Sequence, residues 1–515
     1  MAEQDVTGRL WASDLGFLVP ELTLLAAAVL LALLDLALPQ RYSRQIIGWL
    51  ALGGILAALG SVIWWLLELN PSAAAARPPV RLLGDSYRID DYASVMKLIL
   101  LGSGAMVLLL GLGSVRSDPQ LPDKGEFYTL LLPALLGAMV TVSSGDLITL
   151  YVGLELLALT TYVLVGMRKQ VSLGAEAGIK YVVIGGISSA VTLFGMSYLY
   201  GITGTTHLGQ IGMQMAEAAA RYEAFAYIGL LFVLGGLAVK LAAAPFHAWA
   251  PDVYQGAATP VTALLAVIAK AAVLAALGRI FYNAVVIPAG GLPVGEDMLL
   301  ALQILAAAAM LIGTLAALQQ RNMKRLLALS GVAHAGYLLV PLSVGVAGFQ
   351  SNNLSELIYY LLAYALMTLG AFGVTSAVAE AAGHEEMSGF AGMYYRSPAL
   401  ALAMTVLLLS LAGLPISGGF FGKLFILFGA AQHHAYWLVA VMLGATVAAY
   451  FIYFSILRQM FLRQSDGGGP IRLPVPTAVV IWICVAGTLA LGLVPGPVLE
   501  WIGSIVTLQG DLLLH

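Results

Sequence analysis

The sequence predicts an all-α integral membrane protein with about fourteen transmembrane helices. The 515-residue chain is 60% hydrophobic and only 10% charged, whereas soluble domains carry about 25% charged residues. Apolar runs long enough to cross a bilayer, which takes about 20 helical residues, recur along the whole chain. These runs cover residues 15–38, 45–69, 92–113, 127–144, 147–167, 179–202, 225–254, 260–282, 298–318, 326–346, 354–379, 400–431, 436–462 and 476–498. The leader before the first run is acidic and the run is long, so a retained helix is expected rather than a signal peptide.

Two of the predicted helices, the seventh and the twelfth, are interrupted by helix-breaking residues. These are Pro245 in the seventh helix, and Pro415, Gly418 and Gly419 in the twelfth. Proline removes a backbone hydrogen bond and clashes with the carbonyl four residues earlier, so free carbonyls are expected at Leu241 and Leu411. Irregular backbone is tolerated at membrane depth only where it is buried or lines a wet cavity. The two breaks therefore indicate functional positions.

The spacing of the breaks predicts an internal repeat. They lie five helices apart, so residues 127–282 and 298–462 are expected to be two copies of a five-helix unit. Because five is odd, the second copy is inverted in the membrane. Three transmembrane helices within residues 1–126 precede the repeats, and residues 476–515 form a last transmembrane helix and a tail. Paired broken helices in inverted repeats typically mark a transport site.

Lysine and arginine in the connections predict the orientation of the chain, because cytoplasmic loops carry an excess of both. We take the side that faces the first connection as the inner side. The inner connections hold Arg41, Arg44, Arg116, Lys124, Arg168, Lys169, Lys180, Arg321, Lys324, Arg325, Arg396, Arg458, Arg463 and Arg472, and the outer side holds Arg9, Arg77, Arg81, Arg88, Arg221 and Arg279. Both termini are therefore predicted on the outer side, which would be lumenal or periplasmic.

The basic residues inside the apolar stretches are lysines. They are Lys97, Lys240, Lys270 and Lys423, and none of the sixteen arginines lies in such a stretch. An arginine stays charged in any protein, whereas a desolvated lysine can release its proton. The pattern therefore favours reversible protonation. Lys97 lies five residues into its helix, and its side chain is expected to reach the membrane interface.

One acid and two histidines complete the polar set inside the predicted helices. Glu155 lies near the middle of the fifth helix, His334 in the tenth and His247 in the broken seventh. A charged group at the bilayer centre costs about 2.5–3.5 kcal/mol, so several such groups favour a function over a static ion pair that only fixes helix packing. For His334, packing and proton transfer both stay open, and His247 could satisfy freed carbonyls. Lys180, at the start of the sixth helix, is either a proton inlet or an ordinary interfacial charge.

The sequence predicts no cofactor or metal site in this chain. Its single cysteine, Cys484, cannot form an internal disulfide, a CxxC pair or the ligand set of an iron–sulfur cluster. No GxGxxG occurs, and SGGFFGKL differs from a phosphate-binding loop at Ser417 and Leu424. The net charge of −3 gives no indication of nucleic acid as a partner. Any redox chemistry is therefore expected on other chains.

Four segments resemble the antiporter-like membrane subunits of respiratory complex I and of its photosynthetic relative. They are DLITLYVGLELLALTTYVLVG around Glu155, AAAPFHAWAPDVYQGAATPVTALLAVIAKAA at residues 242–272, KRLLALSGVAHAGYLLV around His334 and LAGLPISGGFFGKLFILF around Lys423. PDVYQGA followed by TPVTA, with lysine at position 423, resembles the subunit-2 (N-type) branch. The resemblance covers about residues 90 to 460. ASDLGFLVPELTLL near the N-terminus is similar to the branch found in cyanobacteria and chloroplasts.

The resemblance implies a horizontal hydrophilic axis in which Glu155 pairs with Lys240, while Lys270 and Lys423 continue a proton path. It implies a translocase subunit of an NAD(P)H– or ferredoxin–quinone oxidoreductase. Iron–sulfur clusters and plastoquinone or another quinone would belong to partner subunits. Those partners would be sister antiporter-like subunits and a peripheral redox arm in a cyanobacterial thylakoid membrane, with ferredoxin as a candidate donor. The alternatives are a subunit of a multisubunit cation/proton antiporter or membrane-bound hydrogenase, a purely structural subunit, and a solute transporter.

Overall fold

The protein is a bundle of membrane-spanning helices. A computed structural model describes residues 14–39, 42–68, 79–115, 118–121, 123–286, 293–345, 353–464 and 471–506. Within these ranges, thirteen helices are long and apolar enough to cross a membrane. Two shorter helices, α16 (Pro398–Ala412) and α17 (Gly418–Gln432), make one further, interrupted crossing. The prediction of an all-α membrane protein with about fourteen transmembrane helices is confirmed for this part of the chain.

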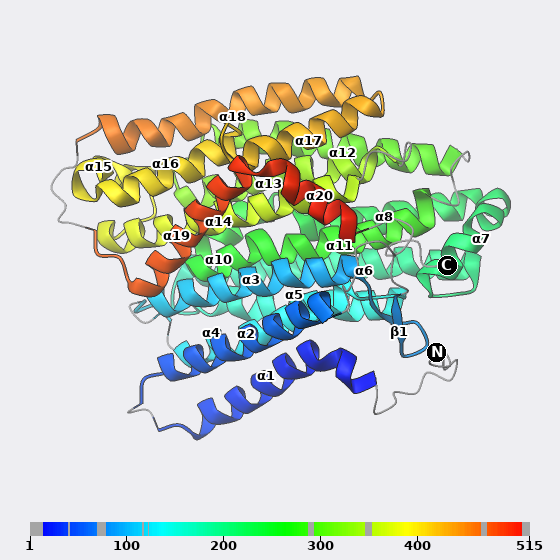
Figure 1. Cartoon of the computed structure of the whole chain (residues 1–515), viewed down its shortest axis with the longest axis horizontal. Helices are drawn as coiled ribbons and strands as arrows, with labels where there is room; N and C mark the ends of the chain where they lie inside the picture. The colour runs from blue at the N-terminus through cyan, green and yellow to red at the C-terminus, as the bar shows by residue number, and fades with distance from the viewer. Residues whose placement is uncertain are drawn as a thin grey trace.

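The order of the elements along the chain is shown by the colours of Figure 1. The elements are η1 (Asp14–Leu18), α1 (Val19–Ala37), α2 (Gln45–Glu68), β1 (Val80–Leu82), β2 (Tyr87–Ile89), α3 (Asp91–Ser114), α4 (Lys124–Val142), α5 (Leu147–Gly166), α6 (Ser172–Thr203), α7 (Leu208–Arg221), α8 (Glu223–Leu241), α9 (Trp249–Gly256), α10 (Thr259–Leu264), η2 (Leu265–Ala269), α11 (Lys270–Phe281), η3 (Tyr282–Val286), α12 (Pro293–Ala317), α13 (Met323–Ser343), α14 (Asn353–Ala382), η4 (Met387–Phe390), α15 (Met393–Arg396), α16, α17, α18 (Tyr436–Leu462), α19 (Val475–Leu493) and α20 (Pro495–Ile505). The elements η2 and η3 are π-helical turns, and η1 and η4 are 3₁₀ turns.

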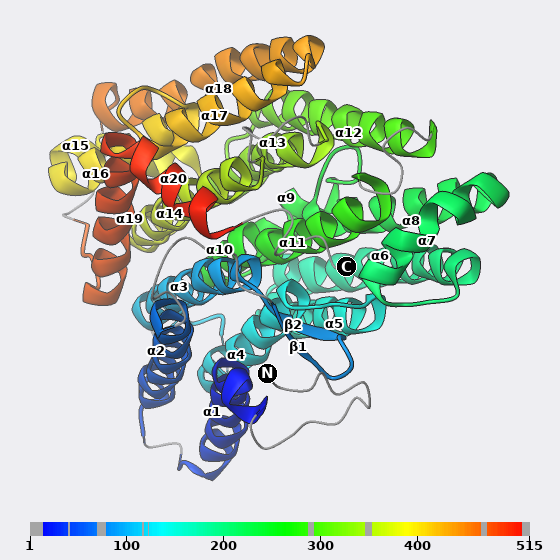
Figure 2. The same cartoon turned by 45° about the vertical axis from the view of Figure 1, so that its right-hand side comes forward.

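The helices differ in how deeply they lie in the bundle. Figures 1 and 2 show α1 and α2 at one flank and α18 at the other, with α11, α13 and α14 between them. The span 259–285 is completely buried, α13 is buried except at Arg325, and α14 is mostly buried, whereas α1 and α18 are mostly exposed. A helix that is apolar all round and buried belongs to the core of a large protein or bundle. The predicted lysine positions Lys270 and Lys423 therefore lie in or beside the protein core rather than against lipid.

The connections alternate between two ends of the bundle. Backbone bridges join connections at each end, namely Asn322 with Glu386 at one end, and Tyr87 with Ser144 and Asp146 with His207 at the other. We call the first the inner end and the second the outer end, where Figure 1 shows the β1–β2 hairpin and α7. The compartment that each end faces stays a prediction. Both chain termini and four of the arginines used for the orientation lie outside the described residues, namely Arg9, Arg41, Arg77 and Arg116.

Both predicted interruptions are present, each in the fourth crossing of a predicted repeat. In the first, α8 ends at Leu241 and α9 begins at Trp249; in the second, residues 413–417 separate α16 from α17. Gly418 and Gly419 are therefore the first residues of α17 rather than part of the gap. The five crossings α4, α5, α6, α8–α9 and α10–α11 correspond in order to α12, α13, α14, α16–α17 and α18. That these are inverted repeats stays a prediction.

Two local features differ from the expectation. The helix α7 was not predicted from the sequence, because its fourteen residues are too short and too polar to cross a bilayer. It buries Leu208, Ile211 and Met215, which share one helical face. The predicted last helix, 476–498, is divided into α19 and α20, because Pro495 cannot continue a helix but fits the first position of a new one.

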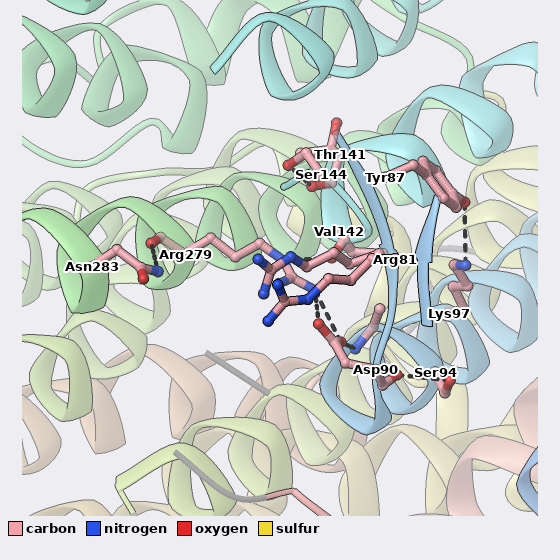
Figure 3. A network of polar contacts seen from close by, with 12 residues as sticks. Arg81, Tyr87, Asp90, Ser94, Lys97, Thr141, Val142, Ser144, Arg279 and Asn283 are labelled. Carbon is pink, nitrogen blue, oxygen red and sulfur yellow. Dashed lines mark hydrogen bonds and ion pairs between the residues drawn. The ribbon is translucent and has the colours of Figure 1, made fainter. Parts of the chain in front are cut away.

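A buried polar network at the outer end contradicts the expected place of Arg279 (Figure 3). Arg279 lies in α11 and is 0% exposed, so the prediction that it belongs to an outer connection, with no arginine inside an apolar stretch, is wrong. Its guanidinium donates to both carboxylate oxygens of Asp90, at 2.9 and 2.7 Å, and to the carbonyl of Val142 at 2.8 Å. Asp90 also caps α3 by accepting from the backbone N–H of Ala93. Local hydropathy could not reveal this burial, because the charge partner of Arg279 lies 189 residues away in the sequence.

The prediction for Lys97, which belongs to the same network, is also wrong. Its side chain does not reach an interface; it is 3% exposed, with Nζ 2.8 Å from a carboxylate oxygen of Glu21 in α1. The Tyr87 hydroxyl donates to the same oxygen at 2.7 Å and accepts from Lys97 at 3.3 Å. Glu21 and Lys97 thus join α1 to α3 inside the bundle. The physical reason is pairing, since a buried charge is retained where an opposite charge and hydrogen bonds compensate its desolvation.

Candidate functional site

Glu155 and Lys240 meet at the first interruption. Glu155 lies near the middle of α5, and Lys240 is in the last turn of α8. The Nζ of Lys240 lies 3.0 Å from Oε1 of Glu155, and it donates to Oγ of Ser189 in α6 at 2.9 Å. The Ser189 hydroxyl in turn donates to the same Glu155 oxygen. The pair implied by the resemblance is thus formed in the structure, and Ser189 closes it into a polar triangle.

Ser189 was not singled out from the sequence. It belongs to a stripe of small polar residues on α6 that includes Ser188 and Thr192, all three of which are buried. Buried hydroxyls on a helix usually bond to the carbonyl four residues earlier, and Thr192 does so at Ser188. Ser189 bonds to the ion pair instead. The stripe could have been found as a polar face in an apolar helix, but its partner could not.

Lys423 lies at the second interruption, beside the end of α16. Its Nζ donates to the carbonyls of Leu411 and Ala412, at 3.0 and 3.2 Å. The carbonyl expected to be freed at Leu411 therefore has the lysine as its partner. At the first interruption, a free carbonyl was expected at Leu241. The side-chain bond found there goes to another carbonyl, that of Val239, which accepts from the indole of Trp249 at 3.0 Å.

Lys270 is the first residue of α11, directly after the π-turn η2. Its Nζ donates to the carbonyl of Gly331 in α13 and lies 5.7 Å from the ring centroid of Tyr364. The side chain is 2% exposed. Among the described residues, no carboxylate lies within ion-pair distance of Lys270 or Lys423. Backbone carbonyls and aromatic faces, which carry partial negative charge, stabilise these ammonium groups instead.

His334 in α13 is buried, and each of its ring nitrogens lies beside a tyrosine hydroxyl. Its Nδ1 lies 2.6 Å from the Tyr360 hydroxyl, and its Nε2 lies 3.3 Å from the Tyr453 hydroxyl. Each tyrosine hydroxyl can both donate and accept, and a neutral imidazole carries one donor and one acceptor nitrogen. The two bonds therefore suit packing and proton transfer equally, as the sequence left open. The tyrosines lie in α14 and α18, too far along the chain for their contact to be predicted.

The same histidine stands between the two central lysines. Its ring centroid is 5.2 Å from that of Tyr364 and 6.1 Å from that of Tyr337. Tyr364 is the ring beside Lys270, and Lys423 lies 4.8 Å from the ring centroid of Tyr337. His334 thus shares one aromatic neighbour with each lysine, which brings Lys270, His334 and Lys423 into one cluster.

The remaining predicted residues, His247 and Lys180, lie outside this cluster. His247 is half-buried in the gap between α8 and α9, and within the described ranges its Nδ1 has no hydrogen-bond partner. Lys180 pairs with Glu176 at 2.5 Å and with Asp252 at 2.6 Å. Asp252 also pairs with Arg325 at 2.6 Å, so these charges join α6, α9 and α13 at the inner end.

A small cavity adjoins Lys240 on the side of α11. Its volume is about 30 Å³, and its lining includes Lys240, the hydroxyl-bearing Thr161, and Ala269 and Val273, which flank Lys270. A cavity needs roughly 10–15 Å³ of such volume, with two or more polar partners, to hold one water molecule. The cavity therefore has room for roughly two water molecules between the triangle and the helix that carries Lys270.

Gly331 sets the position of Lys270. A Cβ atom at residue 331 would lie 2.7 Å from Nζ of Lys270 and 3.0 Å from the Tyr364 hydroxyl. Gly331→Ala is therefore expected to displace the ammonium and, on the proton-carrying role that the resemblance implies for Lys270, to lower the proton-pumping rate by about tenfold to a hundredfold, because misplacement by about 1 Å has effects of this size. Gly186→Ala in α6, where nothing lies within 4 Å of the new methyl group, is the control. Pumping in reconstituted vesicles measures both, and equal rates would contradict this role for Gly331.

Comparison with known proteins places the chain among transporting membrane subunits. Residues 144–448 match the family model described as NADH:quinone oxidoreductase/Mrp antiporter, transmembrane. The subunit N of NADH-quinone oxidoreductase from a Paenibacillus species is 54% identical over 511 residues, with 98% of each chain covered. Its counterpart from Brevibacillus brevis is 44% identical, covering 96% of this chain and 95% of the relative.

Two solved structures share the arrangement of helices. A chain of respiratory complex I from Thermus thermophilus is 31% identical, with a TM-score of 0.77, covering 95% of this chain and all of that one. A chain of the Mrp complex from a Dietzia species superposes with a TM-score of 0.80, covering 98% and 99%. At 21% identity, the second likeness shows the fold alone.

Proposed function

Because this protein belongs to the NADH:quinone oxidoreductase/Mrp antiporter family of membrane subunits, we propose that Glu155, Lys240, Lys270 and Lys423 form its proton path. The protein is a proton-translocating subunit of a quinone oxidoreductase complex. Its work is to move protons, and the iron–sulfur clusters and quinone belong to partner subunits. The polar triangle of Glu155, Ser189 and Lys240, next to a cavity of water size, is the observation that carries the assignment of residues.

The proposed cycle starts with the closed ion pair. While Glu155 lies 3.0 Å from Lys240, the carboxylate stabilises the ammonium group. Conformational or electrostatic work from the redox partners separates the two side chains. The desolvated lysine then releases its proton toward α11 through the cavity. Neutral Lys240 is reprotonated when Glu155 returns, so Glu155 sets the time at which the proton leaves.

Water is needed for the later steps. Packed helices are about 8–10 Å apart, whereas a hydrogen bond spans about 3 Å. The cavity beside Lys240 offers space for water toward Lys270. From Lys270 the proton continues to Lys423 past His334 and the tyrosines bonded to it. These side chains either transfer the proton themselves or orient the water that carries it. The cluster of Lys270, His334 and Lys423 supports this last step.

Lys240→Ala is expected to stop pumping by this subunit while the complex still assembles and reduces quinone. The reason is that the first carrier is lost, although the fold depends on the apolar packing around it. The measurement is the number of protons moved per electron in vesicles that hold the whole complex. Lys169→Ala, which removes an exposed lysine at the inner end, is the control. An unchanged proton-to-electron ratio in assembled Lys240→Ala complex would refute the path.

The electron donor, quinone and membrane are a separate proposal, for which two versions have support. The names of the relatives from Paenibacillus and Brevibacillus favour a respiratory complex in a bacterial membrane. The excess of lysine and arginine in the inner connections adds the proposal that the outer end faces the periplasmic side. The segment ASDLGFLVPELTLL favours the photosynthetic version, with plastoquinone, ferredoxin and a thylakoid membrane. We propose the respiratory version, because those relatives match almost the whole chain.

Native purification decides between these versions and the rival transporters. The protein is extracted from its own membrane in mild detergent, and the subunits and quinone that accompany it are identified. Iron–sulfur subunits with an NADH-oxidising subunit support the respiratory version. A ferredoxin-binding arm with plastoquinone supports the photosynthetic one. Cation-antiporter subunits without a redox centre would instead assign the protein to a purely transporting complex.

A further inference from the structure

A second polar site lies at the inner end, outside the axis described above. It is a pocket of about 360 Å³. Four segments far apart in the chain line it, namely residues 114–115 with 118–121, Arg168, residues 258–260 and residues within 376–385. The first, second and fourth belong to connections or helix ends at the inner end, and the third begins α10. One lining segment of this pocket is therefore the start of the stretch that leads through η2 to Lys270.

A row of alternating charges crosses the wall of the pocket. Asp118 pairs with Arg168 at 2.7 Å, Arg168 approaches Glu385 at 3.9 Å, and Glu385 pairs with Lys324 at 2.5 Å. The side chains of the first three are between 13% and 22% exposed, whereas that of Lys324 is 0% exposed. Glu380 and His384 are the other titratable groups that line the pocket. The row thus runs from groups in contact with solvent to a fully buried ammonium.

Lys324 connects this row with the interior. Its Nζ donates to the carbonyl of Ala257, at the junction between α9 and α10, at 2.8 Å. On α13 it lies seven residues before Gly331, whose carbonyl accepts from Lys270. Residues seven apart share one face of a helix, about 10.5 Å apart along its axis. Lys324 and the contact of Lys270 therefore lie on the same face of α13, separated by two helical turns.

The choice of residue at position 324 needs an explanation. A cation in the first turn of a helix faces the positive end of the helix dipole, which is unfavourable. Burial adds to the cost, and apolar residues often stabilise a buried site as well as an ion pair does. An anchor for the start of α13 would therefore not need a lysine. A lysine differs from arginine and from apolar residues in that it can release and take up a proton.

We propose that this pocket is the site of proton uptake for Lys270, with Glu385 and Lys324 as successive carriers. Glu385 takes a proton from water in the pocket. Lys324 gives one ammonium proton to water on the side of Lys270 and receives the proton held by Glu385. The net result is that one proton moves from the pocket toward the interior of the bundle, and both side chains return to their original protonation states. This inference rests on the proposed role of Lys270 in the axis.

Lys324→Arg tests the uptake site, because arginine keeps the charge and the pairing with Glu385 but does not release a proton. The pumping rate is measured in vesicles of the whole complex that expose the inner end, with electron transfer recorded in parallel. The expected result is assembled complex whose pumping rate is at least about tenfold lower, since a positioned proton carrier contributes about 10²–10⁴-fold. Lys169→Arg, at an exposed ion pair of the same end, is the matched control.

Two further variants make the outcome decisive. Where Lys324→Arg does not assemble, Glu385→Gln, which preserves the shape of the side chain, replaces it and is expected to show the same loss. Lys240→Ala is measured alongside. Full pumping by the inner-end variant, together with loss in Lys240→Ala, overturns the uptake site but leaves the axis standing. Full pumping in Lys240→Ala itself would overturn the axis, and the uptake site with it.

Discussion

Lys270→Arg is expected to lower proton pumping by at least about tenfold, although it preserves the positive charge at the centre of the bundle. A lysine that carries protons must become neutral in each cycle, and arginine does not do so in proteins. Loss of a proton carrier removes a contribution of about 10²–10⁴-fold. The measurement is the number of protons moved per electron by the reconstituted complex.

Lys97→Arg supplies a control of equal burial. Lys97 is 3% exposed and Lys270 is 2% exposed, but Lys97 is paired with Glu21 outside the axis. If burial and packing alone determine the effect on pumping, both substitutions will reduce pumping to the same degree. If the loss of proton release determines it, the Lys97→Arg variant will pump normally. Normal pumping by assembled Lys270→Arg complex would show that Lys270 never gives up its proton.

Arg279→Ala is expected to destabilise the protein by about 3–5 kcal/mol, because it leaves the buried carboxylate of Asp90 without its partner. Asp90→Ala is expected to cost more, since it also removes the N-cap of α3, which is worth about 0.5–2 kcal/mol. Unfolding of the purified protein in detergent, followed by helical circular dichroism, measures both. The apolar double variant Arg279→Met with Asp90→Leu is expected to recover part of the loss, because it leaves no uncompensated charge.

Asp123→Ala provides the comparison for that experiment. Asp123 and Lys169 are half or more exposed, and such ion pairs contribute about 0–1 kcal/mol. A loss for Arg279→Ala as small as that for Asp123→Ala would mean that water reaches Asp90. The Arg279–Asp90 contact of Figure 3 would then not fasten α11 to α3.

The sequence was informative where its signal is local. Apolar runs predicted the crossings, and prolines predicted both interruptions to within a few residues. Glu155, Lys240, Lys270 and Lys423 were identified because charged residues are rare in such runs, and no long-range information is needed to notice them. Their pairing came from the resemblance, since hydropathy says nothing about which helices are neighbours.

The sequence was uninformative where an interaction joins distant segments. Lys97 and Arg279 were misplaced because Glu21 and Asp90, which make their burial tolerable, lie on other helices. Ser189 and Tyr453 were missed because hydroxyl groups are common in membrane helices and only their partners distinguish them. The pocket around Glu385 is assembled from four segments and leaves no pattern in any one of them.

The helix α11 is held very differently at its two ends, and this has a mechanical consequence. Arg279 fastens its outer end to α3, whereas its inner end begins at a π-turn, a wide turn with one extra residue. Conversion of that turn to α-helical bonding shifts the register by one residue and rotates one side of the turn relative to the other by about 100°. Because Arg279 holds α11 in place, this rotation would fall on η2 and α10, and it would move Ala269, which lines the cavity beside Lys240. The surroundings of the Lys270 ammonium can thus be rearranged while α11 itself stays fixed.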